Sequence, residues 1–274
     1  MQLLNSPEIR GCSSFADALR RVFLGVKRAN MHYRFPHPRE AKMNRHAPAD
    51  FANSRHRRTL LKLLASGALG AGGLTGMIRA ALAAGEHPAV NGLHRAAGEV
   101  RVNGVLAGKG TPVKAGDKVT TGKNGQAVFV VGRDAFLLRE SGEIALQGEG
   151  VLVNTLRVIS GKILSVYGKG AHRIATPTAT IGIRGSGAYV EAEAARTYIC
   201  LCYGVADLMD AKDGRVLETV TTTHHESPRY ITGGKDGAMT TQAAGVINHT
   251  DEELVMLEAL QGRLPPFYGE TYPK

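Results

Sequence analysis

Cys200 and Cys202 are separated by a single residue in the stretch TYICLCYGVADL, and the chain has only one other cysteine, Cys12. In a β-strand, residues i and i+2 point to the same face, with their Cα atoms about 6.6 Å apart. That separation is close to the upper limit for a disulfide, so a strand disfavours a bridge between the two thiols. Two thiolates on one face are instead suitable ligands for zinc or another transition metal.

A histidine pair in the next segment is expected to lie beside these cysteines. The stretch ADLMDAKDGRVLETVTTTHHESP predicts two strands that turn at Asp213-Gly214. A two-residue turn places His225 opposite Cys202, whereas a type I turn with a glycine bulge shifts the register by one and places His224 there. In either register, an imidazole lies across from Cys202 with the Cβ atoms about 5 Å apart.

A third histidine comes just before a predicted helix in INHTDEELVMLEALQGRLPP. Thr250 and Glu253 have the spacing of a capping box, and Gly262 marks the end of the helix. The apolar stripe that the helix would bury consists of Leu254, Leu257 and Leu260. If the helix packs over the cysteine strand, His249 completes a set of two cysteines and two histidines, which matches zinc in number and softness.

Two other interpretations of the cysteines remain open. Ile199, Leu201 and Tyr203 alternate with them, so the strand is apolar on both faces, and free cysteine is an ordinary small core residue. A thiol beside a histidine is also the pairing of a Cys-dependent enzyme, centred here on the same two cysteines and His225. The sequence offers no oxyanion donor, no Ser-His-Asp order and no paired-carboxylate motif, which favours a non-enzymatic protein.

The elements that must position these residues are mostly strands. From Glu99 to residue 210 the apolar residues recur with a period of two, and glycine turn signals interrupt the runs. The pairs that mark the turns are Asn103-Gly104, Asn124-Gly125, Ser141-Gly142 and Ser160-Gly161. We therefore predict an all-β fold, an antiparallel sandwich or roll of short hairpin-connected strands with one C-terminal helix.

Three glycines, Gly182, Gly185 and Gly187, have a spacing that raises the possibility of a phosphate loop. In such a loop the glycines follow a strand and open a helix, whose N-terminus holds the anion. Here strand-like alternation stands on both sides of the glycines, so we interpret them as a bulge or tight bend in a sheet. Arg184, between them, is suited either to a carboxylate ligand or to a structural ion pair.

The stretch TPTATIGIRGS and the segments before it resemble the FecR domain, the periplasmic β-domain of ferric-citrate-type signalling regulators. The resemblance covers roughly residues 98–210, and Ser186 stands where the family has threonine. Its motif consists of Thr176, Pro177, Ala179, Ile181, Ile183, Arg184 and Gly185. The resemblance implies a domain that senses, binds or scaffolds at the cell envelope, with an envelope protein or a small molecule as partner. The sequence shows no convincing anti-sigma segment. The resemblance to the family's regulators therefore applies only to their exported β-domain.

The positive charge of the chain is concentrated before residue 85. Residues 1–84 hold 14 of the 34 lysines and arginines but 4 of the 24 acidic residues, so the remainder holds 20 of each and is formally neutral. A formally neutral segment has no excess of basic residues to bind the phosphates of DNA or RNA, and nucleic acid is therefore not an expected partner.

The basic part contains a pattern typical of an export signal. Arg57 and Arg58 precede a Gly- and Ala-rich apolar run, and the small residues around Ala83 suit a cleavage site. The pattern resembles a twin-arginine signal. Five glycines between Gly67 and Gly76 interrupt the apolar run, which disfavours a stable membrane span. We expect a soluble periplasmic or secreted protein.

The sequence divides into four parts on these criteria. Residues 1–42 are interpreted as a leader that is not translated or is disordered, with Met43 as the expected start; a short cytosolic regulatory helix is the alternative. Residues 43–84 form the export signal, residues 85–210 the FecR-like β-domain, and residues 211–274 the return strand of the hairpin and the capping helix. The expected function is a non-enzymatic envelope protein, and the alternative is a periplasmic metal-binding protein or Cys-dependent enzyme.

Overall fold

The computed structural model describes residues 76–77, 88–234 and 237–268. In chain order, the main elements are β1 (Gly92–Ala97), β2 (Val100–Val102), β3 (Val105–Leu106), β4 (Lys118–Thr121), β5 (Gln126–Val131), β6 (Asp134–Leu138), β7 (Glu143–Glu149), β8 (Leu152–Val166), β9 (Ala171–Ala175), β10 (Ala179–Ala192), β11 (Arg196–Asp210), β12 (Val216–Thr222), β13 (Arg229–Gly233), β14 (Met239–Ala243) and α3 (Asp251–Leu260).

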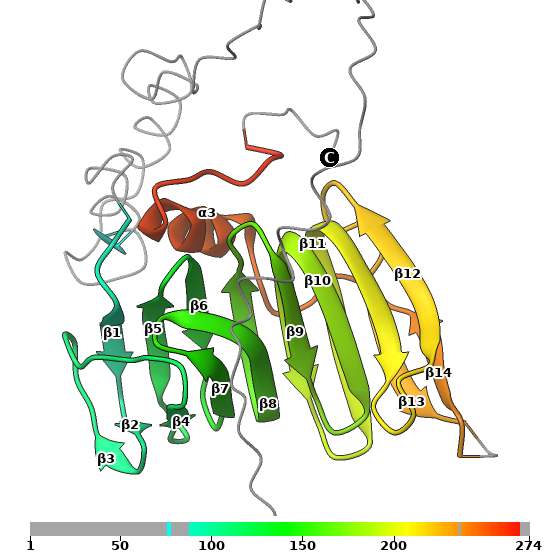
Figure 1. Ribbon diagram of the computed structural model, residues 1–274, viewed down its shortest axis with the longest axis horizontal. Helices are drawn as coiled ribbons and strands as arrows, with labels where there is room; N and C mark the ends of the chain where they lie inside the picture. Colours follow the sequence, from blue (N-terminus) through cyan, green and yellow to red (C-terminus); the bar gives the residue numbers. More distant parts are fainter. Residues whose placement is uncertain (1–75, 78–87, 235–236, 269–274) are drawn as a thin grey trace, which may run out of the picture. The chain divides into compact units, whose positions relative to one another are not determined.

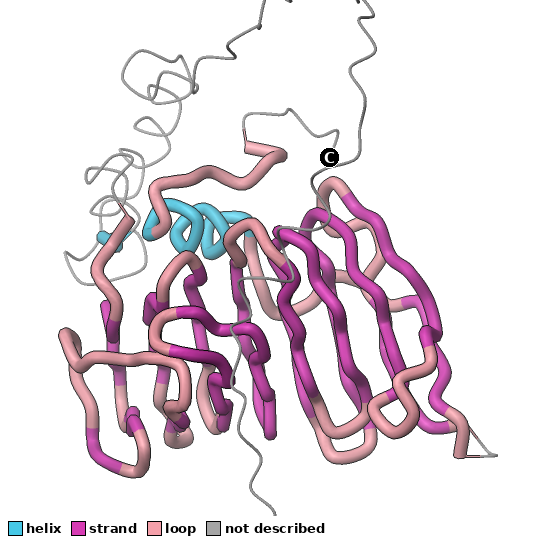
Figure 2. The backbone as a smooth tube through the Cα atoms, viewed as in Figure 1, coloured by secondary structure: helices cyan, strands magenta, loops and turns pink. Residues whose placement is uncertain are grey.

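All these strands belong to one 14-stranded sheet, and α3 packs against β6 and β8 (Figure 1). The pairings between strands are antiparallel, except that β8 and β9 run parallel. Strands make up most of the described chain and α3 is its one substantial helix (Figure 2), which confirms the predicted all-β class with a C-terminal helix.

Strand β8 differs from its prediction, because it runs through Ser160-Gly161 where a turn was expected. Its first part pairs with β7 as far as Ser160, and its second part pairs with β6 and β10. Gly161 has φ 92°, and a Cβ there would lie 2.6 Å from the Cα of Gly142. Glycine at this position therefore lets the strand bend between two sets of partners, and a turn signal was the wrong interpretation.

The other turn signals are real turns, but only some of them close hairpins. Asn103-Gly104 joins β2 to its partner β3, as predicted. The chain also turns near Asn124-Gly125 and Ser141-Gly142, yet the strands on either side of these pairs do not pair with each other. Several hairpins lie where the sequence analysis named no turn, among them the one that joins β5 to β6 at Gly132, where φ is 60°, and the ones that join β7 to β8 and β10 to β11.

The sheet has a hydrophobic core on each of its two faces. Ile199 and Leu201 of β11 belong to the larger core, which also contains Phe129, Phe136 and Ile163. Cys200 and Cys202 point to the opposite face, into a second core that includes the apolar residues of α3. The expected alternation along β11 is therefore confirmed, and the two cysteines face the same core as the helix.

The predicted helix has the expected N-terminus. Thr250 is its N-cap, and the reciprocal capping box with Glu253 is present. The stripe residues Leu254, Leu257 and Leu260 are buried. Because fully burying one such side chain is worth about 1.5–3 kcal/mol, this stripe is sufficient to hold α3 against the sheet.

The glycine-rich segment is a bulged strand, as predicted. Gly185 has φ 56°, and the pairing of β10 with β11 shifts on both sides of Gly187. Ahead of the strand, the Thr176 hydroxyl accepts from the Ala179 N–H at 2.9 Å and contacts Thr197 at 2.7 Å. Thr176, the first residue of the motif, thus has structural contacts at the start of β10.

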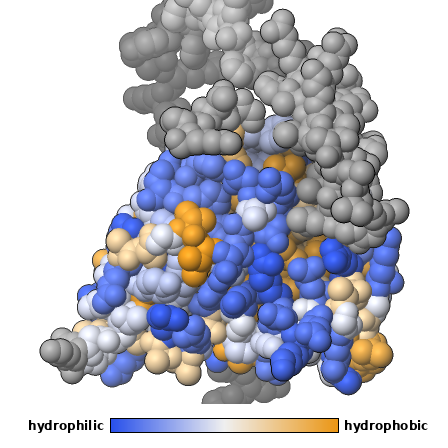
Figure 3. Space-filling model, turned by 180° about the vertical axis from the view of Figure 1, so that it is seen from behind, coloured by the Kyte–Doolittle hydropathy of each residue, from blue (hydrophilic) through white to orange (hydrophobic). Residues whose placement is uncertain are grey.

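The face of the domain that Figure 3 shows is mainly polar, with scattered apolar side chains. Val90 is the most exposed of the large apolar residues described, followed by Val105 and Leu106 of β3 and Leu152 at the start of β8. Among the described residues, no helix has the length and apolar character that crossing a membrane requires.

Candidate metal centre

The site forms where one edge of β11 lacks a strand partner. On that edge β12 pairs with Gly204–Met209 and β13 pairs with Arg196–Ile199, so residues 200–203 face the connection between the two strands. The Thr222 hydroxyl donates to the Leu201 carbonyl at 2.9 Å, and the His225 N–H donates to the Cys202 carbonyl at 3.0 Å. The connection is therefore held directly beside the cysteines.

The hairpin register decides which histidine enters this gap. Val205 pairs with Thr221, which is the register of the bulged turn, and the two-residue register that placed His225 opposite Cys202 is wrong here. Strand β12 ends at Thr222, however, so neither histidine occupies a strand position. His225 lies in the following turn with φ 58°, and this left-handed backbone directs its ring toward the thiols.

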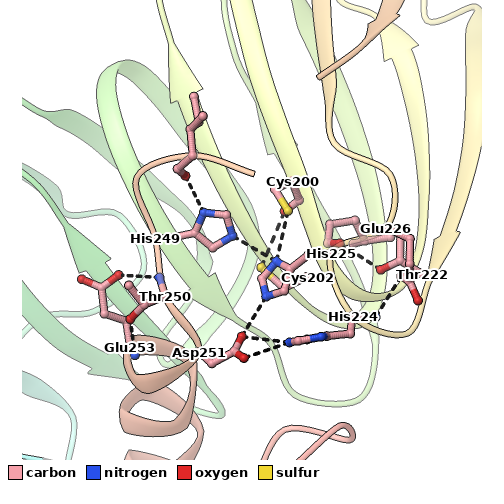
Figure 4. Close-up of polar contacts among 12 residues, drawn as sticks. Cys200, Cys202, Thr222, His224, His225, Glu226, His249, Thr250, Asp251 and Glu253 are labelled. Atoms are coloured by element: carbon pink, nitrogen blue, oxygen red, sulfur yellow. Dashed lines mark hydrogen bonds and ion pairs between the residues drawn. The ribbon is translucent and has the colours of Figure 1, made fainter. Parts of the chain in front are cut away.

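Four predicted ligands come together at this point (Figure 4). The Cys200 Sγ lies 3.2 Å from the His225 Nδ1, which in turn lies 3.1 Å from the His249 Nε2. One donor atom from each of Cys200, Cys202, His225 and His249 lies within 4.8 Å of all the others. His224 is not part of this set, because its Nε2 lies 3.0 Å from each carboxylate oxygen of Asp251.

The outer nitrogen of each inward-facing ring has a hydrogen-bond acceptor. His249 Nδ1 lies 2.7 Å from the Ile247 carbonyl, and His225 Nε2 lies 3.1 Å from an oxygen of Asp251. Both outer nitrogens must therefore carry hydrogen, which leaves the inner nitrogens as the free ends of the rings. Two such nitrogens 3.1 Å apart repel each other unless they share a cation, either a proton or a metal ion.

The segment that carries His249 is held by contacts from β10 and from the residue that follows β6. The His249 ring stacks on Tyr189 of β10, with the centroids 4.5 Å apart. Arg139, after β6, donates to the Asn248 carbonyl at 2.6 Å and forms an ion pair with Glu253 at 2.7 Å. The position of this ring is therefore fixed before any ligand binds.

Sequence reasoning missed three of the residues that organise the site: Asp251, Tyr189 and Arg139. Asp251 lies in the first turn of α3, where an acidic residue is accounted for by the helix dipole alone. Tyr189 pairs directly with Cys200 across the β10–β11 hairpin, so the register of this hairpin was an available signal. A second signal was that Asp251 stands two residues from His249, whereas Arg139 lies far from the ligands in sequence and no spacing rule identifies it.

The metal-free site carries a pair of opposite charges. A hydrogen bond from the Cys202 thiol, together with one from His225, lowers the pKa of Cys200 to about 4 despite its burial. Burial disfavours the charged form of His225, but hydrogen bonds to Asp251 and Cys200 raise the pKa of this histidine to about 9. Burial also raises the pKa of Cys202 well above its usual range, so this thiol stays neutral.

We expect the metal-free protein to keep one thiolate in weakly acidic solution. The ultraviolet absorbance of this thiolate should titrate near pH 4 instead of the usual value of about 8.5. Cys200→Ser should remove the signal. Cys202→Ser should retain it, because the serine hydroxyl can donate to the Cys200 thiolate in place of the Cys202 thiol. A midpoint near the usual value in the native protein would contradict the ion-pair assignment.

The same shifts determine how stability depends on pH in the metal-free form. The lowered pKa of Cys200 contributes stability that is fully present above the ordinary thiol pKa and is lost as the pH falls through about 4. The raised pKa of His225 contributes stability that is fully present below the ordinary imidazole pKa and is lost as the pH rises through about 9. The Cys200 contribution therefore weakens only toward acidic pH, and the His225 contribution weakens only toward alkaline pH.

The remaining predicted residues lie elsewhere. Arg184 forms an exposed ion pair with Asp207 at 2.9 Å, which is the structural alternative foreseen for it. Both cysteines of the site are free and fully buried, so they are packed in a core as well as placed beside imidazoles. Cys12, Met43, the Arg57-Arg58 pair and the expected cleavage site near Ala83 lie outside the described residues.

Comparison with known proteins adds little to this description. No protein-family profile and no curated protein matches the chain. Two crystal structures of a protein from Parabacteroides distasonis, described as a "putative anti-sigma factor", are similar to part of it, with TM-scores of 0.39 and 0.38 at 8% and 7% identity. The match covers 47% of this chain and 60% of that protein. A similarity of this level supports no functional conclusion, so the function must be inferred from the site.

Proposed function

We propose that this chain is a non-enzymatic metal-binding β-domain protein, which holds zinc or a similar transition metal between Cys200, Cys202, His225 and His249. The observation that carries the proposal is the convergence of the four donor atoms within 4.8 Å. Two sulfurs and two imidazole nitrogens are the number and type of ligands that zinc takes in tetrahedral sites.

The surroundings of the ligands support the same conclusion. The His225 ring is oriented by a carboxylate and the His249 ring by a backbone carbonyl, which is the usual outer arrangement of metal-binding histidines. All four ligands are supplied by the protein and lie in its interior, as in closed structural sites, whereas catalytic zinc keeps one position for water. We therefore assign the ion a structural or sensing role, with the alternative of a Cys-dependent enzyme disfavoured by the burial of both thiols.

Cobalt substitution tests this proposal directly. The first equivalent of cobalt(II) should give the visible absorption of a tetrahedral ion and the near-ultraviolet charge-transfer bands of thiolate ligands. The double variant Cys200→Ser/Cys202→Ser should lose both sets of bands, while Arg184→Gln, which breaks only the exposed ion pair, should retain them. Cobalt binding without thiolate bands in the native protein would refute the assignment.

We further propose that the domain acts at the cell envelope after export, as its FecR-like motif suggests. The support is the signal-like pattern of residues 55–85 and the neutral charge of the chain that follows it. A twin-arginine route moves folded chains, so it would allow the metal to be loaded while the cysteines are still reduced in the cytoplasm. The partner at the envelope is then another protein or a small molecule.

Export should depend on the arginine pair. Replacing both Arg57 and Arg58 by lysine is expected to retain the protein in the cytoplasm, and fractionation followed by immunoblotting measures its distribution. The exported native form should begin close to residue 84 by N-terminal sequencing. Unchanged export of the double-lysine variant would exclude the twin-arginine route without bearing on metal binding.

A further inference from the structure

The ring of His225 has a second group of possible ligands on its outer side. Its Nδ1 faces the cysteines, while its Nε2 lies 3.1 Å from the Asp251 Oδ1. The His224 Nε2 lies 3.0 Å from the same oxygen, so two imidazole nitrogens and a carboxylate surround one point (Figure 4). These three residues also satisfy the distances of a metal-binding group.

The two sides of the ring differ in chemistry and in access to solvent. The inner side is enclosed and sulfur-rich, whereas Asp251 has 45% of its side chain exposed and His224 has 16%. Imidazole and carboxylate ligands suit the divalent ions of zinc, nickel and copper. Three protein ligands at the surface would leave a coordination position for water or for a small anion.

The outer group is held in place without an ion. The His224 ring packs against Phe267, with the centroids 4.2 Å apart, and against the His225 ring at 4.7 Å. The N–H groups of Thr223 and His224 both donate to the Glu226 carboxylate, which fixes the turn that carries the two histidines. Asp251 is held by its position in the first turn of α3.

We propose that His224, His225 and Asp251 form a second, more open site for a divalent transition metal, in which the His225 ring bridges the two ions. The inference rests on the proposed function, because a first ion on Nδ1 makes the hydrogen on Nε2 easier to displace. The second ion replaces this hydrogen, which leaves as a proton to solvent. The Asp251 oxygen that accepted it becomes a ligand. His224 binds through Nε2, so the hydrogen that this nitrogen donates to Asp251 in the metal-free protein shifts to Nδ1.

The number of zinc ions bound distinguishes this second site from an arrangement in which His224 and Asp251 only orient His225. The full-length protein is equilibrated with zinc, freed of weakly bound ions by gel filtration and analysed for zinc and protein. We expect two zinc ions in the native protein and one in His224→Ala, with His224→Gln as a second variant that keeps a polar side chain. His94→Ala is the matched control and should keep two, because His94 contacts only the Val90 carbonyl among the polar contacts described.

The cobalt spectrum separates failure of this inference from failure of the proposed function. In the His224 variants the thiolate charge-transfer bands should keep their native intensity while the total metal count falls by one. One zinc ion in both the native protein and the variants would overturn the second site and leave Asp251 and His224 as residues that only orient His225. Native protein without thiolate bands, but with a zinc ion that the His224 variants lose, would refute the cysteine site and also the bridging role of His225.

Discussion

Replacing Cys202 by serine is expected to weaken binding of the first zinc ion by at least about 100-fold, because loss of an outer-shell partner already costs roughly 10–100-fold and a ligand contributes more. The serine hydroxyl is close in size to the thiol, so the second core should remain packed. It is a poor zinc ligand, however, and the three remaining donors cannot complete the tetrahedral set. Competition with a chromophoric chelator measures the affinity.

The control for this variant lies on the same strand. Ile199→Val shortens a side chain that points into the opposite core, and it should cost about 0.5–1.5 kcal/mol of stability without changing zinc affinity. An affinity of Cys202→Ser within threefold of the native value would mean that the thiol is only a packing residue. The proposed function would then be wrong even though the donor atoms converge.

Removing the ion from the loaded protein is expected to lower the midpoint of thermal unfolding by roughly 8–16 °C. A ligand present at about 1,000 times its dissociation constant stabilises the folded state by about 4 kcal/mol. For a domain of about 150–250 residues, each kcal/mol corresponds to about 2–4 °C. Calorimetry before and after treatment with a chelator, followed by readdition of zinc, measures the shift.

The ion would connect three segments of the fold. Its ligands come from β11, from the turn after β12 and from the residue before the cap of α3, three segments that are otherwise linked by hydrogen bonds and packing. The double variant Cys200→Ser/Cys202→Ser should unfold at the same temperature with and without chelator. Superimposable curves for the loaded and stripped native protein would show that the ion, if bound, contributes nothing to the fold.

Local sequence patterns were sufficient for the features that depend on neighbouring residues. The capping box of α3 is satisfied within one turn, so Thr250 and Glu253 identify its start. The period of two along β11 likewise places Cys200 and Cys202 on one face, and the glycines of β10 mark a bulge. Each of these follows from backbone geometry over a few residues.

Features that depend on which strands pair could not be predicted in the same way. Ser160-Gly161 has the composition of a turn, yet β8 continues through it. The part of the strand before Gly161 pairs with β7 and the part after it pairs with β10, so both parts stay in the sheet. Turn residues indicate where the chain can bend, but they do not indicate which strands will pair. The hairpin at Gly132 is the opposite case, since the chain turns there without one of the turn pairs that the sequence analysis named.

The sequence by itself determined the types of ligand in this protein: two thiols on one face of a strand, a histidine pair after the next strand and a histidine before a helix cap. The tertiary structure alone decided that β12 and β13 share one edge of β11, which opens the gap that His225 enters. It also brought Asp251 to the outer nitrogen of that ring and Tyr189 against the face of His249. These contacts join segments far apart in the chain, and they form because burial of α3 brings the segments together.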